Sequence, residues 1–341
     1  MMQEFKINKT VFKASTEFTT EFEIHSHPEN YKVRFDSLPE SFSDKDVVLI
    51  DENVRKLYDV RHSKLFSIQA TEANKSIETV LELCKVLTDN GFDKGSTLIV
   101  IGGGILQDIG AFVSKIYKRG INWKYYPTTL LSQADSCIGG KTALNFENYK
   151  NQLALFSAPS EVIIDTNFIN TLTPDDITSG YGEIVKLFLI GGDFYINQLS
   201  TMDIRTAIFH SLMIKKAVIE VDEFERDERK ALNYGHSFGH VIEPLTDYKI
   251  PHGEAVLLGI DIINKLFDNN PTITNIVNRY TSIEKIKTLT PDTIVGALRS
   301  DKKVSNGIIT LVRVPSAGTT TFEPTAINEG LTQKVYEIFT N

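Results

Sequence analysis

The chain of 341 residues contains only two cysteines and one tryptophan, and it has no long apolar run. Two cysteines cannot build a disulfide framework, which favours a reducing compartment. A membrane-spanning helix needs roughly 18 consecutive apolar residues, and no segment approaches that length. The N-terminus also lacks the basic-then-apolar pattern of a secretion signal. The sequence therefore predicts a cytoplasmic protein with no membrane partner.

The chain also contains fewer basic than acidic residues. Lysine and arginine number 36 against 44 aspartates and glutamates, so the formal net charge is −8. Proteins that bind nucleic acid normally carry a basic face, and we expect no nucleic-acid partner. An anionic small-molecule substrate is compatible with this charge, because a local cationic pocket can exist in an acidic protein.

Short apolar runs indicate the fold of the first half. Residues 47–50, 97–101 and 161–165 are rich in branched side chains and are bounded by aspartate or glycine, which is typical of strands buried on both faces of a parallel sheet. Residues 77–88 repeat apolar side chains at helical spacing. This alternation of strands and helices predicts an open α/β sheet.

The character of the sequence changes near residue 174. Long amphipathic segments dominate beyond it, and strand signals nearly vanish until residues 307–312. Pro174 stands where a helix can begin. We therefore expect a Rossmann-like, open parallel sheet domain at residues 1–173 and a mainly α-helical domain at residues 174–341, with the active site in the cleft between them.

Glycines and small polar residues indicate ligand binding in the first domain. Gly102 to Gly104 follow a predicted strand and precede a helical segment at residues 105–118. Such a loop binds a pyrophosphate or forms a simple tight turn, and both interpretations stay open. Residues 127–151 combine glycines, hydroxyls and separated lysines, a composition that suits a phosphorylated, polyhydroxylated ligand.

Three of the seven histidines fall in one short window. His236 and His240 are four residues apart and share one face of a predicted helix, and His252 follows. Imidazoles in this arrangement suit a divalent metal ion, although an isolated pair is more often solvated or buried in a core. Glu183 lies three residues before Lys186, and the two form either an internal ion pair or part of a larger site.

Between about Asp51 and Gly307 the chain resembles 3-dehydroquinate synthase, within the sugar-phosphate cyclases. The most specific segments are residues 102–186 and 215–254. The resemblance implies a zinc (or cobalt) site made of Glu183, His236 and His252, with His240 among the phosphate-contacting groups instead.

The resemblance also implies three further sets of residues. The groups that contact the reacting part of the substrate would be Asp135, Lys186, Lys215, Arg229, Asn233 and His240. The substrate phosphate would be bound by Lys141, Asn151, His240, Lys302 or its neighbour Lys303, and Arg119 from a second subunit of a homodimer. NAD would be bound by Asp51, Asn53, Glu72, Lys75, Gly103, Gly104, Asp108, Thr128, Thr129, Lys150, Thr171 and Leu172.

The implied activity belongs to the shikimate pathway and is that of a phosphorus–oxygen lyase. It converts 3-deoxy-D-arabino-heptulosonate 7-phosphate, an anionic sugar phosphate, into a carbocycle. Phosphate is eliminated after transient NAD-dependent oxidation of an alcohol held at zinc. Arg229, Lys215 and Asn233 favour a substrate with a carboxylate, because the pair of cations Arg229 and Lys215 would otherwise face an empty site.

Three alternatives remain. One is a sister cyclase of a specialised pathway, of the aminocyclitol or valiolone type, and another is a metal- and NAD-dependent alcohol dehydrogenase. The third is a non-catalytic paralogue. Departures from the usual family pattern, such as Gln107, Ala143 and Asp227 where glycine is common, indicate a divergent member.

Overall fold

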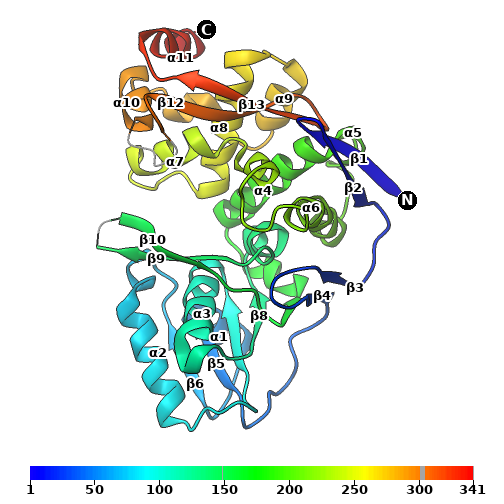
Figure 1. The fold of residues 1–341 in the computed structure, drawn as a ribbon, viewed down its shortest axis with the longest axis vertical. Coiled ribbons are helices and arrows are strands. Elements are labelled where there is room, and N and C mark those ends of the chain that lie inside the picture. Colours follow the sequence, from blue (N-terminus) through cyan, green and yellow to red (C-terminus); the bar gives the residue numbers. More distant parts are fainter. Residues whose placement is uncertain (148, 300–303, 341) are drawn as a thin grey trace. The chain divides into compact units, whose positions relative to one another are not determined.

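The computed structural model describes residues 1–147, 149–299 and 304–340. The chain forms two compact units. We name Thr19–Thr173 the sheet unit, and we name Met1–Phe18 together with Pro174–Asn341 the helical unit. Figure 1 shows the elements of both units. In the part of the chain that is described, no helix is both long and apolar enough to cross a membrane.

The sheet unit is built on seven strands in the order β3-β4-β11-β8-β7-β5-β6. Neighbouring strands are parallel except for β3 with β4. The strands are β3 (Glu21–Ile24), β4 (Tyr31–Phe35), β5 (Val47–Asp51), β6 (Leu65–Ile68), β7 (Leu98–Gly102), β8 (Trp123–Pro127) and β11 (Glu161–Ile164). The three predicted apolar runs lie on β5, β7 and β11, and every residue of β7 is buried. The predicted parallel α/β sheet is confirmed.

Helices cover this sheet. α1 (Glu52–Tyr58) packs against β5 and β6, α3 (Gly104–Ile116) packs against β7 and β8, and α2 (Ile77–Asp89) packs against α3. The predicted helix at residues 105–118 is α3 followed by the turn η2 (Tyr117–Arg119), because Lys118 adopts a positive φ that breaks the helix. The remaining elements are η1 (Glu72–Asn74), the π-helical turn η3 (Ser132–Ser136), η4 (Thr166–Thr171) and a hairpin of β9 (Lys141–Phe146) and β10 (Tyr149–Phe156).

The helical unit begins its second segment with α4, which starts at Pro174 as predicted. Its helices are α4 (Pro174–Gly191), α5 (Asp193–Ile196), α6 (Ile204–Ile219), η5 (Glu228–Asn233), α7 (His236–Leu245), α8 (His252–Phe267), α9 (Pro271–Val277), η6 (Ile283–Ile286), α10 (Pro291–Leu298) and α11 (Glu329–Thr340). The long helix α8 packs on both α4 and α7. The predicted mainly helical character of this part is confirmed.

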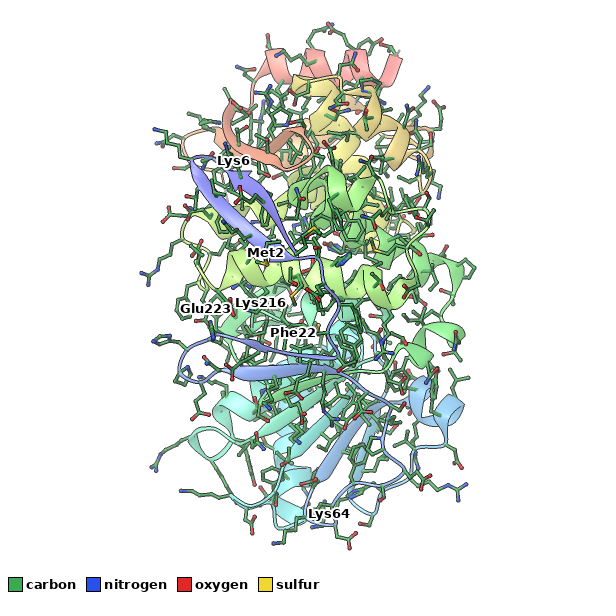
Figure 2. The ribbon with its side chains drawn as sticks, turned by 90° about the vertical axis from the view of Figure 1, so that its right-hand side faces the viewer. Met2, Lys6, Phe22, Lys64, Lys216 and Glu223 are labelled. Carbon is green, nitrogen blue, oxygen red and sulfur yellow. The ribbon has the colours of Figure 1, made fainter. Side chains whose placement is uncertain are left out.

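The first 18 residues differ from the predicted division, which placed residues 1–173 together. They form β1 (Met2–Ile7) and β2 (Thr10–Ser15), which join β12 (Ile308–Ser316) and β13 (Thr319–Ala326) in a sheet with the order β12-β13-β1-β2. β1, which Figure 2 marks at Met2 and Lys6, pairs in parallel with β13. This pairing joins segments more than three hundred residues apart, so no local pattern could reveal it.

Candidate metal and nucleotide sites

Three helices of the helical unit bring together a carboxylate and three imidazoles. Glu183 lies on α4 and its side chain is 1% exposed. Its Oε1 atom lies 3.5 Å from Nε2 of His236, near the start of α7, and 3.2 Å from Nε2 of His252, at the start of α8. The Glu183 carboxylate also forms an ion pair with Lys186, one turn along α4. These residues are far apart in sequence, and helix packing alone makes them neighbours.

Glycines beside these residues explain how the helices approach so closely. A Cβ atom on Gly182 would lie 2.1 Å from the carbonyl oxygen of Gly253, and one on Gly253 would lie 1.8 Å from the carbonyl oxygen of Ser179. The backbones of α4 and α8 therefore touch directly. Likewise, a Cβ atom on Gly259 of α8 would lie 2.0 Å from the carbonyl oxygen of Gly235, just before α7. No larger residue permits these contacts.

Neighbouring acceptors determine which ring nitrogen carries the proton in two of the histidines. Nδ1 of His236 lies 3.2 Å from the backbone carbonyl oxygen of Tyr234, and Nδ1 of His252 lies 3.2 Å from Oε2 of Glu243. Both acceptors favour a proton on Nδ1, which leaves Nε2 of each ring as the nitrogen that can bind a metal ion once it is deprotonated. Two imidazole nitrogens and one carboxylate oxygen form the donor set of a catalytic zinc site. The residues present therefore fit a divalent metal ion.

The charges around His252 also favour a cation at this site. Burial alone would lower the pKa of His252, but hydrogen bonds and charge from Glu183 and Glu243 outweigh it and raise this pKa to about 10. In the metal-free protein a proton thus occupies His252 between two carboxylates. A cation is favoured at that position, whether it is a proton or a metal ion.

His240 belongs to the same cluster. Its ring centroid lies 5.2 Å from that of His236 and 5.7 Å from that of His252. One nitrogen from each of these three rings lies within 4.8 Å of the other two, a spacing that can hold a metal ion. His240 is the exposed member of the group. The sequence assigned it to phosphate binding rather than to the metal, and its position beside the cluster is compatible with either contact.

Buried cations accompany the cluster in the helical unit. Lys186, Lys215 and Arg229 are 2%, 8% and 2% exposed. Such charges are costly to bury without polar partners, and the Arg229 guanidinium donates to the carbonyl oxygen of Glu223. A set of buried cations suits an anionic substrate.

Two residues that the sequence did not single out shape the segment before α7. The carboxylate of Asp222 accepts hydrogen bonds from the backbone N–H groups of Arg226, Asp227 and Arg229, at 2.9, 2.8 and 3.0 Å. Burial raises the pKa of Asp222, but these hydrogen bonds outweigh it and lower the pKa overall. Glu225 accepts a 2.6 Å hydrogen bond from the side-chain amide of Asn233. Only a folded loop reveals either role.

In the sheet unit, the predicted cofactor residues gather at the carboxyl ends of the parallel strands. Asp51 ends β5, Gly103 and Gly104 follow β7, and Thr128 and Thr129 follow β8. Ligands of open parallel sheets bind at this edge. A Cβ atom on Gly103 would lie 3.0 Å from the Thr129 methyl group, so the two loops are in close contact at this point.

Other predicted cofactor residues of the sheet unit form hydrogen bonds with nearby residues. Asp51 caps α1 by accepting from the backbone N–H of Asn53 at 3.0 Å, and burial raises the pKa of Asp51. Thr171 lies on η4, where its hydroxyl is 3.0 Å from that of Tyr58, and Leu172 follows it. The predicted cofactor residues thus lie on several separate elements of one unit.

Lys75 links residues from two of the predicted sets. Its Nζ atom lies 2.6 Å from Oδ2 of Asp108 and donates to Oδ1 of Asn151 at 2.7 Å. Burial raises the pKa of Asp108 despite the charge of Lys75. Lys150 lies 3.6 Å from the carboxylate of Glu72. Residues implied for cofactor and for phosphate binding therefore form one polar group.

Asn145, which the sequence did not single out, holds this group together. Its side-chain amide donates to the carbonyl oxygen and to the carboxylate of Glu72, at 3.0 and 2.9 Å. Its Oδ1 atom accepts from the backbone N–H of Asn151 at 3.1 Å. Asn151 adopts a positive φ of 57°, so this hydrogen bond stabilises an unusual backbone conformation.

Asp135 lies on the π-helical turn η3, a rare form that often occurs at functional sites. Gln107 on α3 ties this turn in place: its side chain donates to the carbonyl oxygen of Ser136 at 2.7 Å and accepts from the Ser136 hydroxyl at 2.8 Å. This departure from the family pattern thus has a structural role. Lys141 begins β9 and is exposed.

The remaining predicted phosphate contacts are Arg119 and Lys302 or Lys303. Arg119 lies exposed on η2, and its implied role depends on a second subunit. Lys302 and Lys303 lie outside the described residues.

Known proteins resemble this chain along most of its length. The N-terminal family model of 3-dehydroquinate synthase matches residues 65–179, and the C-terminal model matches residues 180–304. A 3-dehydroquinate synthase from Pelagibacter ubique is 38% identical over 283 residues, covering 74% of this chain and 76% of the relative. The enzyme of the same name from Alkaliphilus metalliredigens is 34% identical, covering 79% of this chain and 83% of the relative.

Solved structures share the fold at lower sequence identity. A 2-deoxy-scyllo-inosose synthase complexed with carbaglucose-6-phosphate, NAD+ and Co2+ has a TM-score of 0.80 at 20% identity, covering 93% of this chain and 99% of that chain. A 2-epi-5-epi-valiolone synthase from Streptomyces hygroscopicus with NAD+ and Zn2+ bound has a TM-score of 0.75 at 23% identity, with coverages of 86% and 90%. The fold is thus that of the sugar-phosphate cyclases. Within this class, the chain belongs to the 3-dehydroquinate synthase family, as its motifs predicted.

Proposed function

We propose that this chain is a 3-dehydroquinate synthase, a phosphorus–oxygen lyase of the shikimate pathway that acts on 3-deoxy-D-arabino-heptulosonate 7-phosphate. The observation that carries the proposal is the approach of Glu183 Oε1 to Nε2 of both His236 and His252. The family match supports the same reaction. By this proposal the protein is a cytoplasmic homodimer without a nucleic-acid or membrane partner.

The chain supplies binding and orientation for two groups. Glu183, His236 and His252 would hold Zn2+ or Co2+, and the predicted residues at the carboxyl edge of the sheet would hold NAD. The chemistry that NAD would supply when bound is reversible hydride transfer with a substrate alcohol, and the divalent ion would supply Lewis-acid polarisation of that alcohol. Both of these groups must reach the same substrate.

The remaining residues bind the substrate itself. Lys215 and Arg229 would pair with its carboxylate, because buried cations attract an anion strongly when water is excluded. Asp135, Lys186 and Asn233 would contact its hydroxyl groups.

The phosphate has a separate set of contacts. Lys141, Asn151 and His240 would bind it, together with Arg119 of the second subunit and Lys302 or Lys303. Elimination of phosphate requires that its negative charge be stabilised as the bond breaks, and these groups would provide that stabilisation.

A product assay tests the proposal. The full chain is incubated with the heptulosonate phosphate, NAD+ and Zn2+ or Co2+, and inorganic phosphate is measured while the carbocycle is identified by mass and NMR. We expect phosphate release and 3-dehydroquinate. His252→Ala should lose bound metal and activity while NAD+ binding stays measurable.

Other outcomes would overturn the proposal in distinguishable ways. Turnover of a sugar phosphate that lacks a carboxylate, in place of the heptulosonate, would identify a sister cyclase. Reduction of NAD+ by a simple alcohol, without phosphate release, would identify a dehydrogenase. Absence of any turnover, with ligand binding intact, would identify a non-catalytic paralogue.

A further inference from the structure

Glu243 lies seven residues after His236 on α7, so both side chains occupy one face of that helix. Its side chain is 15% exposed, and its Oε2 atom lies 3.2 Å from Nδ1 of His252. No sequence motif singled this residue out. We infer that Glu243 is a positioning residue of the metal site, which holds His252 in the orientation and protonation state that a metal ligand needs. The inference rests on the proposed function.

The argument begins with the two nitrogens of His252. An ionised carboxylate only accepts hydrogen bonds, so Nδ1 of His252 must carry the proton that is shared with Glu243. The lone pair of the neutral ring then resides on Nε2, the atom that lies 3.2 Å from Oε1 of Glu183. Without Glu243, the proton is free to occupy either nitrogen and the ring is free to turn.

The position of His252 makes such a support necessary. His252 is the first residue of α8, and the N-cap of that helix, Pro251, makes no side-chain hydrogen bond. The side chain of His252 is 31% exposed. His236 is oriented differently, since its Nδ1 meets the backbone carbonyl oxygen of Tyr234. One histidine is thus oriented by backbone and the other by a side chain that substitution can remove.

The charge of Glu243 has a second effect. A carboxylate bonded to the far nitrogen of a ligating imidazole makes the near nitrogen a stronger electron donor. Mutation of a partner of this kind typically lowers metal affinity by about 10- to 100-fold. Glu243 therefore acts through His252 and needs no contact with substrate.

The test compares zinc affinities in the full chain, measured by competition with a chromogenic chelator. We expect Glu243→Ala to weaken zinc binding by about 10- to 100-fold. Glu243→Gln keeps an oxygen that accepts the Nδ1 proton but lacks the charge, so its loss should be smaller. Glu337→Gln, on the exposed face of α11, removes one negative charge elsewhere and should bind zinc like the unmodified chain.

The visible spectrum of the Co2+-loaded protein gives a readout that a merely structural role would not move. We expect Glu243→Gln to shift the ligand-field bands of the bound Co2+, because the His252 imidazole becomes a weaker electron donor. If Glu243→Ala and Glu243→Gln bind zinc as tightly as the unmodified chain, while His252→Ala does not, the inference is overturned and the metal site stands. If the unmodified chain itself does not bind zinc, the proposed metal site fails with it.

Discussion

At the scale of single residues, the stability of the metal cluster depends on pairing the buried charge of Glu183 with cations. The carboxylate of Glu183 is almost completely buried, and a buried charge must be paired or hydrogen-bonded. The ammonium of Lys186 and the imidazolium of His252 supply that pairing in the metal-free protein. A bound metal ion would replace the proton on His252, so the site exchanges one cation for another.

This exchange makes a prediction about pH. The pKa of His252 is raised to about 10 from an ordinary value of 6.5, so the folded metal-free protein holds this proton more tightly than the unfolded chain. The resulting stability is fully present below about pH 6.5 and is lost as pH rises through about 10. We expect urea unfolding of the metal-free protein to show this decline between pH 7 and pH 10.

The matched control is His252→Ala, which lacks the titrating ring and should show a flatter dependence in the same range. Zinc affinity should change in the opposite sense and increase with pH over this interval, because binding releases the proton. A zinc affinity that does not change between pH 6.5 and pH 8.5 would contradict the assignment.

A second residue-scale prediction concerns Asn145. Its side chain fixes Glu72 and the backbone of Asn151, so Asn145→Ala removes contacts that shape the predicted nucleotide site. We expect NAD+ affinity, measured by calorimetry, to fall severalfold because the site must be ordered on binding. Zinc affinity should not change. Gln152→Ala serves as the control, since Gln152 is exposed in the same hairpin and bonds only to the carbonyl oxygen of Lys150 among the hydrogen bonds described.

At the scale of elements, the site depends on close contacts between helices. Glu183, His236 and His252 each stand next to a glycine whose backbone contacts a neighbouring helix or the turn that precedes one. Direct backbone contact leaves no room for a side chain, and it fixes the distance between ligands on different helices. The π-helical turn η3, tied by Gln107, plays a comparable part for Asp135 in the sheet unit.

Gly253→Ala tests the contact between α4 and α8. A Cβ atom there would lie 1.8 Å from a backbone oxygen, so the helices must separate. We expect a loss of about 1–3 kcal/mol in the free energy of unfolding, together with weaker zinc binding. Chemical denaturation and chelator competition measure the two effects.

The matched control is Gly296→Ala on α10, where a Cβ atom meets nothing within 4 Å. In a helix interior, alanine is favoured over glycine by roughly 0.5–1 kcal/mol, so this variant should be slightly more stable and should bind zinc normally. Equal stability of the two variants would contradict the packing argument.

At the scale of the whole molecule, the chain crosses between its units near residues 18 and 173. The N-terminal strands complete the sheet of the helical unit, where Phe5 and Phe12 stack with ring centroids 5.4 Å apart. Thr10 also donates a 2.9 Å hydrogen bond to Glu228, on the turn that carries Arg229. The start of the chain therefore supports a segment of the predicted substrate site.

Phe12→Ala tests this role. Phe12 is 3% exposed, and truncation of a buried phenylalanine usually costs about 3–5 kcal/mol. We expect hydrogen exchange to rise in β1, β2, β13 and the turn at Arg229, while the strands of the sheet unit stay protected. Val11→Ala, at a residue that is 46% exposed, should leave both regions unchanged. Increased exchange confined to the sheet unit would disprove the assignment of these strands.

Much of this protein could be predicted from sequence because its signals are local. Apolar runs mark β5, β7 and β11, Pro174 marks the start of α4, and the spacing of His236 and His240 places both rings on one helical face. The family motifs then indicated Glu183 and His252 as their companions. Each of these inferences needs only the period of a helix or strand, or a short motif.

Tertiary structure alone decided the rest, because the partners are distant in sequence. The pairing of β1 with β13, the hydrogen bond between Glu243 and His252, and the network around Asn145 each join segments that share no local pattern. A sequence fixes which groups are present and which face of an element they occupy. The distances between those groups follow from how elements pack, and backbone contact at glycines sets those distances here.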